Sequence, residues 1–85
     1  MAISIQHLPD GGASLEFGPG DVAAVRAAIT ARYGKMRRRW FVLAAEVTFG
    51  GEQFAFQNEW SDPCLIARSE RASAMLERIA DDLGA

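Results

Sequence analysis

The fold is decided by residues 40–60, which read WFVLAAEVTFGGEQFAFQNEW. Two adjacent glycines, Gly50 and Gly51, mark a two-residue hairpin turn, because glycine adopts positive φ without strain. Apolar and polar residues alternate on both sides of the turn, which is typical of strands with one buried face. We therefore predict a long strand over 40–49 and a partner over 52–60. The register pairs Val47 with Phe54, Ala45 with Phe56 and Phe41 with Trp60 on one face, and Thr48 with Gln53 and Ala44 with Gln57 on the other.

The N-terminal half predicts a second hairpin followed by a helix. Residues 3–8 and 13–17 alternate in the same way around the turn sequence PDGG at 9–12. A helix over 22–33 follows, with Asp21 as its N-cap and Gly34 after its last residue. Its apolar stripe is formed by Val22, Val25, Ile29 and Tyr33.

The C-terminal third predicts helical structure only. Asp62 and Pro63 are typical of a helix start, so we predict one short helical turn over 64–67. Ser69 caps a second helix. The stripe of that helix comprises Ala72, Met75, Leu76, Ile79 and Leu83.

The element order is therefore ββαββα, which predicts a single α+β domain over 1–85. Its simplest arrangement is a four-stranded antiparallel sheet with both helices packed on one face. The sheet side chains under the helices would be Ile3, Ile5, Leu15, Phe17, Phe41, Leu43, Val47, Phe54 and Phe56. An alternative is a sheet shared by two chains.

The charges are segregated along the chain. The net charge is only −2, yet residues 22–45 hold six of the nine basic residues and no acid. The remainder holds three basic residues against eleven acids, a balance of −8. Such a dipole steers a charged partner or favours head-to-tail self-contact, although charges on a solvated surface also cluster without a role. The six basic residues are Arg26, Arg32, Lys35, Arg37, Arg38 and Arg39.

Composition and motifs argue against catalysis and against a membrane or secreted location. The sequence has one cysteine, no signal-peptide pattern at its start and no apolar stretch long enough to span a bilayer, so we expect a soluble cytoplasmic protein. It lacks phosphate-loop, dinucleotide-binding and zinc-protease motifs. The only histidine, His7, is best explained as a strand-end residue, and Cys64 as a small buried one. We expect no enzyme activity, no metal and no cofactor.

The feature most suggestive of function is the basic run 35–39 followed by Trp40. Arginine and tryptophan are enriched in protein–protein hot spots. Basic residues beside an aromatic also grip phosphates and stack a base, and a plain solvated loop is the third interpretation. Strand parity places Trp40, Val42 and Ala44 on the open face, where Ala55 and Glu46 join them.

We therefore expect a small non-catalytic protein-binding module, an inhibitor or accessory of the immunity, antitoxin or anti-defence type, that masks a partner surface. The predicted contact residues are Lys35, Arg37, Arg38, Arg39, Trp40 and Val42. The alternative is a nucleic-acid-binding protein that uses the same run, and a homodimer that pairs its sheet edges is the third hypothesis. Salt dependence separates the first two, since phosphate contacts weaken steeply with salt.

Overall fold

The computed structural model describes residues 3–40, 45–59 and 62–85. Within them the chain is α+β, with two helices and one antiparallel sheet of six strands. The elements in chain order are β1 (Ser4–His7), β2 (Ala13–Glu16), the short 3-10 helix η1 (Pro19–Asp21), α1 (Val22–Tyr33), β3 (Arg37–Trp40), β4 (Ala45–Phe49), β5 (Glu52–Glu59), β6 (Asp62–Ala67) and α2 (Glu70–Asp82). Across the sheet the strands lie in the order β1-β2-β6-β5-β4-β3.

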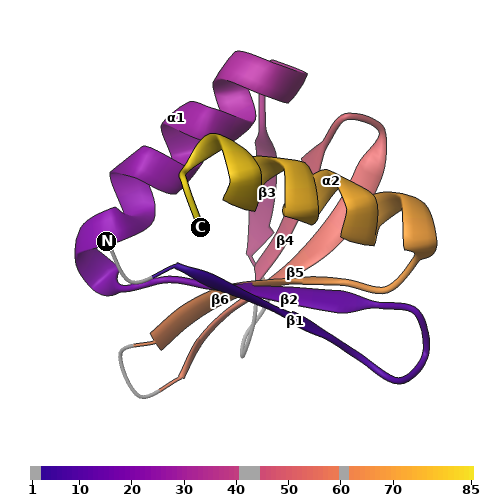
Figure 1. The fold of residues 1–85 in the computed structure, drawn as a ribbon. Helices are drawn as coiled ribbons and strands as arrows, with labels where there is room; N and C mark the ends of the chain where they lie inside the picture. The colour runs from indigo at the N-terminus through magenta and orange to yellow at the C-terminus, as the bar shows by residue number, and fades with distance from the viewer. Residues whose placement is uncertain (1–2, 41–44, 60–61) are drawn as a thin grey trace.

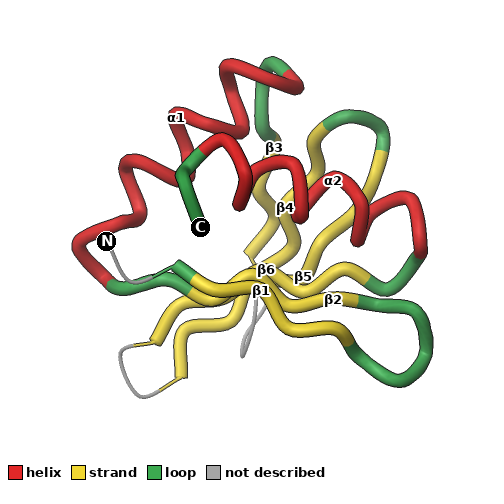
Figure 2. The backbone as a smooth tube through the Cα atoms, in the orientation of Figure 1, coloured by secondary structure: helices red, strands yellow, loops and turns green. Residues whose placement is uncertain are grey.

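Both helices lie on the same side of the sheet (Figure 1). The sheet bends, so that the β4–β5 hairpin rises beside α2 while β1 and β2 pass beneath it (Figure 2). The core lies between the two layers, and Phe49 and Phe54 stack inside it with ring centroids 4.2 Å apart. Its other buried members include Leu15, Phe17, Val25, Ile29, Val47, Leu65, Leu76 and Ile79.

The expected four-stranded sheet is wrong, and β6 is one of the two reasons. Residues 62–67 form a central strand between β2 and β5 instead of a helical turn. Pro63, which lacks an N–H group, stands near the start of this strand, and its carbonyl accepts a hydrogen bond from Phe17 N at 3.1 Å. Leu65 and Ala67 are buried on the helix side, and β6 joins the two hairpins into one sheet.

The second correction concerns the expected strand over 40–49. The chain instead forms two antiparallel strands, β3 and β4, in which Trp40 lies opposite Ala45 and Arg37 opposite Thr48. Residues 37–39 of the basic run are therefore part of the sheet, and with Trp40 they form its last strand. The observed order ββαββββα replaces ββαββα.

The register of the β4–β5 hairpin is as predicted. Ala45 pairs with Phe56, Val47 with Phe54 and Thr48 with Gln53. In the first hairpin Ile5 pairs with Leu15 and His7 with Ala13. The predicted pairs Phe41–Trp60 and Ala44–Gln57 lie outside the described residues.

Both long helices were predicted, and their ends follow the capping signals. Helix α1 spans the predicted residues and ends where Gly34, at φ +82°, donates its N–H to Thr30 O. The Ser69 hydroxyl accepts from Ala72 N at 3.1 Å and caps α2. Asp21 differs from the prediction, because its carboxylate accepts from Gly18 N and does not cap α1. In the described part of the chain, neither helix has the length and apolarity to cross a membrane.

The glycines of the β4–β5 turn offer a matched test of the packing between hairpin and helices. Both have positive φ, +58° at Gly50 and +81° at Gly51. A Cβ on Gly50 would lie 2.5 Å from Met75 Cε and 3.1 Å from Tyr33 Cδ1, whereas one on Gly51 meets no atom within 4 Å. We expect Gly51→Ala to cost about 1–2 kcal/mol for backbone conformation alone. Gly50→Ala should cost about 1 kcal/mol more, because the end of the Met75 side chain must turn away and the Tyr33 ring must move slightly.

Urea unfolding of both variants measures this difference. Equal losses of unfolding free energy would contradict the close packing of the turn against Tyr33 and Met75.

Candidate functional site

The predicted basic run lies at one edge of the sheet. In β3, Arg37 and Arg39 lie opposite Thr48 and Glu46, and Arg38 lies opposite Val47. Val47 is buried on the helix side, so Arg38 belongs to the helix side, and Arg37 and Arg39 to the open face. All three arginines are exposed. The strand therefore presents positive charge on both faces of the sheet edge.

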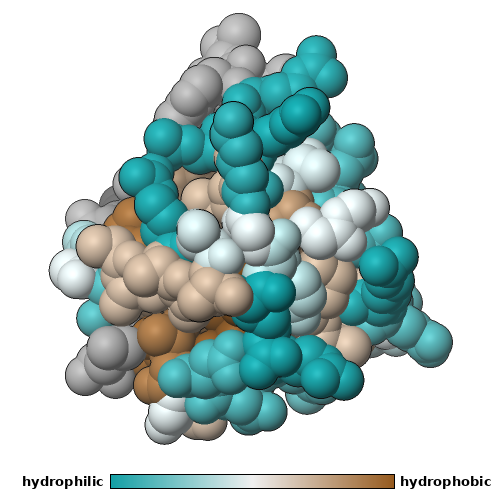
Figure 3. Space-filling view, turned by 90° about the horizontal axis from the view of Figure 1, so that it is seen from above, coloured by the Kyte–Doolittle hydropathy of each residue, from teal (hydrophilic) through white to brown (hydrophobic). Residues whose placement is uncertain are grey.

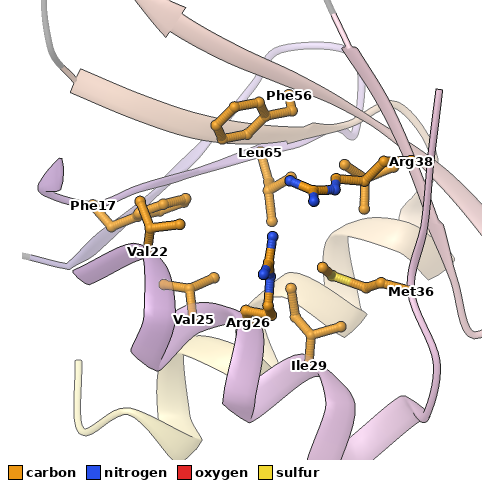
Figure 4. Close-up of a pocket in the computed structure, with 10 residues that line it drawn as sticks. Phe17, Val22, Val25, Arg26, Ile29, Met36, Arg38, Phe56 and Leu65 are labelled. Carbon is orange, nitrogen blue, oxygen red and sulfur yellow. The ribbon is translucent and has the colours of Figure 1, made fainter. Parts of the chain in front are cut away.

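An apolar hollow lies beside this strand, between α1 and the helix side of the sheet (Figure 4). Its volume is about 60 Å³. Helix α1 forms one wall, and Met36 and Arg38, before and within β3, form the other. The sheet side is formed by Phe17 just after β2, Val47 of β4, Phe56 of β5 and Leu65 of β6. The ten lining residues are Phe17, Val22, Val25, Arg26, Ile29, Met36, Arg38, Val47, Phe56 and Leu65.

The size of the hollow limits what it accepts. One water molecule needs about 10–15 Å³ of cavity volume, so the hollow has room for about four to six water molecules. That is close to the heavy-atom count of one branched aliphatic side chain. Pockets for cofactors and drug-sized ligands measure roughly 300 Å³ or more. The hollow thus suits a single side-chain anchor and is too small for a nucleobase or a cofactor.

Two guanidinium groups converge on the hollow. Those of Arg26, from α1, and Arg38, from β3, both point toward its centre (Figure 4). None of the ten lining residues is acidic. Within the part of the chain that the structure describes, Arg26 forms no ion pair or hydrogen bond through its side chain. Of the two, Arg26 has no such partner in the described residues, so a carboxylate from a binding partner is favoured beside its guanidinium group.

An ion pair reduces the positive charge at the other end of α1. Arg32, one of the six basic residues of the segment, donates to both Asp82 carboxylate oxygens at 2.6 and 2.8 Å. This hydrogen bond lowers the pKa of Asp82 and raises that of Arg32. The pair is partly exposed, so it adds little stability, but it offsets the charge at the far end of α1. Of the remaining basic side chains of α1 and β3, Arg26 and Arg38 line the hollow, and Arg37 and Arg39 lie on the open face of the sheet.

The outer face of α1 continues the apolar surface beyond the hollow. Val22 and Arg26 line both the hollow and a shallow depression on α1 formed by Ala23, Ala27, Thr30 and Ala31. Val22 is 37% exposed. Seen from above the helices, an apolar band lies between hydrophilic side chains (Figure 3). The apolar surface of α1 therefore reaches the edge of the hollow at Val22 and Arg26.

The structure brings only part of the predicted site together. Lys35 is exposed and precedes β3, outside the lining of the hollow. The prediction placed Trp40 on the open face by assuming one unbroken strand over 40–49. Trp40 instead lies in β3, opposite Ala45 of β4, so that assumption does not hold. Val42 lies outside the described residues. Arg26 was missed as a contact residue, and its only signal in the sequence is its place in the acid-free segment 22–45.

The residues considered for catalysis lie apart. His7 Nε2 is 3.2 Å from Glu77 Oε1, and His7 pairs with Ala13 on the helix side of the sheet. Cys64 is half-buried in β6 opposite Glu16 and Gln57, on the open face. The sheet therefore separates the histidine from the thiol. In ranges 3–40, 45–59 and 62–85 no group of three or more potential ligand side chains is arranged to hold a metal ion.

Comparison with known proteins adds no assignment: no family model, curated protein sequence or solved structure matches the chain. The functional argument therefore depends on the geometry of the hollow and of β3.

Proposed function

We propose that this chain is a non-catalytic protein-binding module that masks an acidic surface of a partner protein, in the manner of an inhibitor or accessory protein. The observation that carries the proposal is the convergence of Arg26 and Arg38 on an apolar hollow beside a basic edge strand. Such a site combines a pocket for an anchor residue with charge-assisted hydrogen bonds, which is how hot spots are built.

The expected contributions to the binding free energy favour a protein partner. Burying one aliphatic side chain in the hollow contributes about 1.5–3 kcal/mol. Each charge-assisted hydrogen bond to a carboxylate adds about 1.5–3 kcal/mol. Together these terms are a substantial part of the roughly 8 kcal/mol of micromolar binding.

Nucleic acid is the weaker candidate for two reasons. The hollow is too small for a base, so stacking would have to occur elsewhere. Outside residues 22–45 the chain carries a balance of −8, which repels a polyanion that extends beyond the basic edge.

The test is capture of the partner from a lysate of the cells that make the protein, with nuclease treatment and at two salt concentrations. The tagged full chain should retain one stoichiometric protein after nuclease. The variant Arg37→Glu/Arg39→Glu should lose it, because both exposed side chains of the basic edge change sign. The control Arg71→Glu/Arg78→Glu alters net charge equally on α2 and should retain it.

Two results would overturn the proposal. One is equal loss of the partner by both double variants, which would mean that net charge alone governs capture. The other is recovery of nucleic acid that is released at higher salt with a slope of about 0.9 per phosphate contact, which would assign the basic edge to phosphate binding.

A further inference from the structure

We infer that the free edge of β1 is a self-association surface, along which β1 of one chain pairs antiparallel with β1 of a second copy. The two six-stranded sheets then join into one continuous sheet, with the helices of both copies on the same side. The interface lies at the opposite end of the sheet from β3. The inference therefore goes beyond the proposed function and does not depend on it.

The two edges of the sheet differ in how they are protected. Within the described residues, β1 and β3 each pair with one strand only, so the outer edge of each presents unpaired N–H and C=O groups. Charged side chains and proline commonly keep such an edge from pairing with another chain. β3 carries three arginines, whereas β1, with the sequence SIQH, has no lysine, arginine, aspartate, glutamate or proline. β1 is therefore the edge that accepts another strand.

Hydrogen bonds inside the sheet determine which backbone groups of β1 face outward. Leu8 N donates to Gly12 O at 2.9 Å and continues the β1–β2 register by one pair. Alternate residues of an antiparallel strand direct their backbone groups to the same side. The N–H and C=O groups of Gln6 therefore face β2. Those of Ile5 and His7 face the free edge.

The other side of β2 agrees with this assignment. Phe17 N donates to Pro63 O at 3.1 Å and continues the β2–β6 register by one pair. The odd-numbered residues of β2 therefore direct their backbone groups to β6, and the even-numbered ones to β1. Ser14, an even-numbered residue, lies opposite Gln6. Two hydrogen bonds on different strand pairs thus give the same direction for the backbone groups of β1.

These directions favour one register for the paired strands. A two-fold axis perpendicular to the sheet pairs residues of the same parity, so that side chains of the helix side meet on that side. An axis at Ile5 sets Ile5 against Ile5 of the second copy, and Ile3 against His7. All three residues then use their outward backbone groups. An axis at Gln6 instead sets Ile3 against Pro9, which has no N–H to donate.

Apolar side chains at the edge supply a second argument for a second copy as the partner. Ile5 lies opposite the buried Leu15, so its side chain is on the helix side of the sheet. Ile3 and Ile5 pack against the core but remain partly exposed. In the paired sheet the two Ile5 side chains become cross-strand neighbours, which buries them further. The edge is therefore complementary to itself in hydrogen bonding and in apolar contact.

Charge pairs on the open face test both the dimer and its register. With the axis at Ile5, Ser4 lies opposite Gln6 of the second copy, and both side chains are exposed. In Ser4→Lys/Gln6→Glu a lysine faces a glutamate in two symmetry-related pairs. In Ser4→Lys/Gln6→Lys a lysine faces a lysine in both, which is destabilising in cross-strand positions.

Sedimentation equilibrium of the full chain measures the association. The interface is short, so we expect a reversible monomer–dimer equilibrium with a Kd between about 10 μM and 1 mM. Ser4→Lys/Gln6→Glu should dimerise at least as tightly as the parent. Ser4→Lys/Gln6→Lys should dimerise at least about tenfold more weakly than Ser4→Lys/Gln6→Glu, which corresponds to about 1.4 kcal/mol.

The control for net charge is Ala23→Lys/Ala27→Lys. Both alanines are exposed on α1, and the variant adds the same charge as Ser4→Lys/Gln6→Lys without touching β1. It should dimerise as the parent does.

Amide hydrogen exchange followed by NMR tests the pairing residue by residue. The Ile5 N–H should exchange rapidly in dilute protein and slowly at high concentration, because only the dimer gives it an acceptor. The Gln6 N–H should be protected at both concentrations, since it faces β2.

Three results would overturn the inference. The first is a parent chain that stays monomeric at about 1 mM. The second is assembly beyond a dimer, which would indicate head-to-tail pairing of β1 with β3. The third is equal association of the two charge variants, which would place the contact elsewhere or in another register. None of these results affects the proposed function, because Ser4→Lys/Gln6→Lys should still capture the partner through the opposite end of the sheet.

Discussion

Replacing Phe54 by alanine should lower the free energy of unfolding by about 3–5 kcal/mol, the largest stability effect that we expect from a single substitution. Phe54 is 1% exposed and stacks on Phe49 with an interplanar angle of 4°. Its loss removes the aromatic contact and leaves a cavity between the sheet and the helices. The free energy of unfolding of a small domain is only about 5–15 kcal/mol in total, so the variant should be partly unfolded at about 37 °C.

The control is Gln53→Ala, one residue earlier in β5. Gln53 is exposed and pairs with Thr48 on the opposite face. This substitution should change stability by no more than about 0.5 kcal/mol. Urea unfolding followed by circular dichroism measures both. A loss below about 1 kcal/mol for Phe54→Ala would contradict a core centred on the Phe49–Phe54 stack.

The parts of the fold that follow from the sequence are those with local signals. The glycine pair at 50–51 sets both the turn and the register of β4 and β5, because a one-residue slip would expose Val47 and Phe54. Helix α2 follows from Ser69 and the apolar stripe after it. These elements carry their own turn or cap, so no knowledge of tertiary contacts is needed.

The two missed strands lack such signals. Strand β3 has three consecutive arginines, and an edge strand charged on both faces shows no apolar alternation. Residues 62–67 combine a helix-start signal with a short apolar run, and a run of that length is ambiguous between strand and helix. The strand forms because β2 and β5 flank it on both sides, a contact between distant parts of the sequence.

The candidate site was only half predictable for the same reason. The arginines of β3 stand out in the sequence as a run. Arg26 lies eleven residues before Arg37, and half of the other exposed positions in its helix are alanine. Only the bend of the sheet brings α1 and β3 to opposite sides of one hollow. Sequence spacing alone does not indicate that α1 and β3 lie on either side of one hollow.

Blocking the hollow should abolish capture of the partner without affecting the fold. Val22 is the first residue of α1, lines the hollow and is 37% exposed, so a larger side chain can be added there without disturbing the core. In Val22→Trp the indole occupies the space of the incoming anchor. Losing about 1.5–3 kcal/mol of anchor burial weakens binding by at least about tenfold. Ala74→Trp is the matched control, because Ala74 is exposed on α2 and lines neither the hollow nor the depression on α1.

The most direct test of the account is therefore capture of the partner by the parent chain, Val22→Trp and Ala74→Trp, compared on proteins of equal stability to urea. The account predicts that Val22→Trp loses the partner while Ala74→Trp retains it as the parent does. Unchanged capture by Val22→Trp, or the same loss in both variants, would contradict the assignment of the hollow between α1 and β3 as the anchor site.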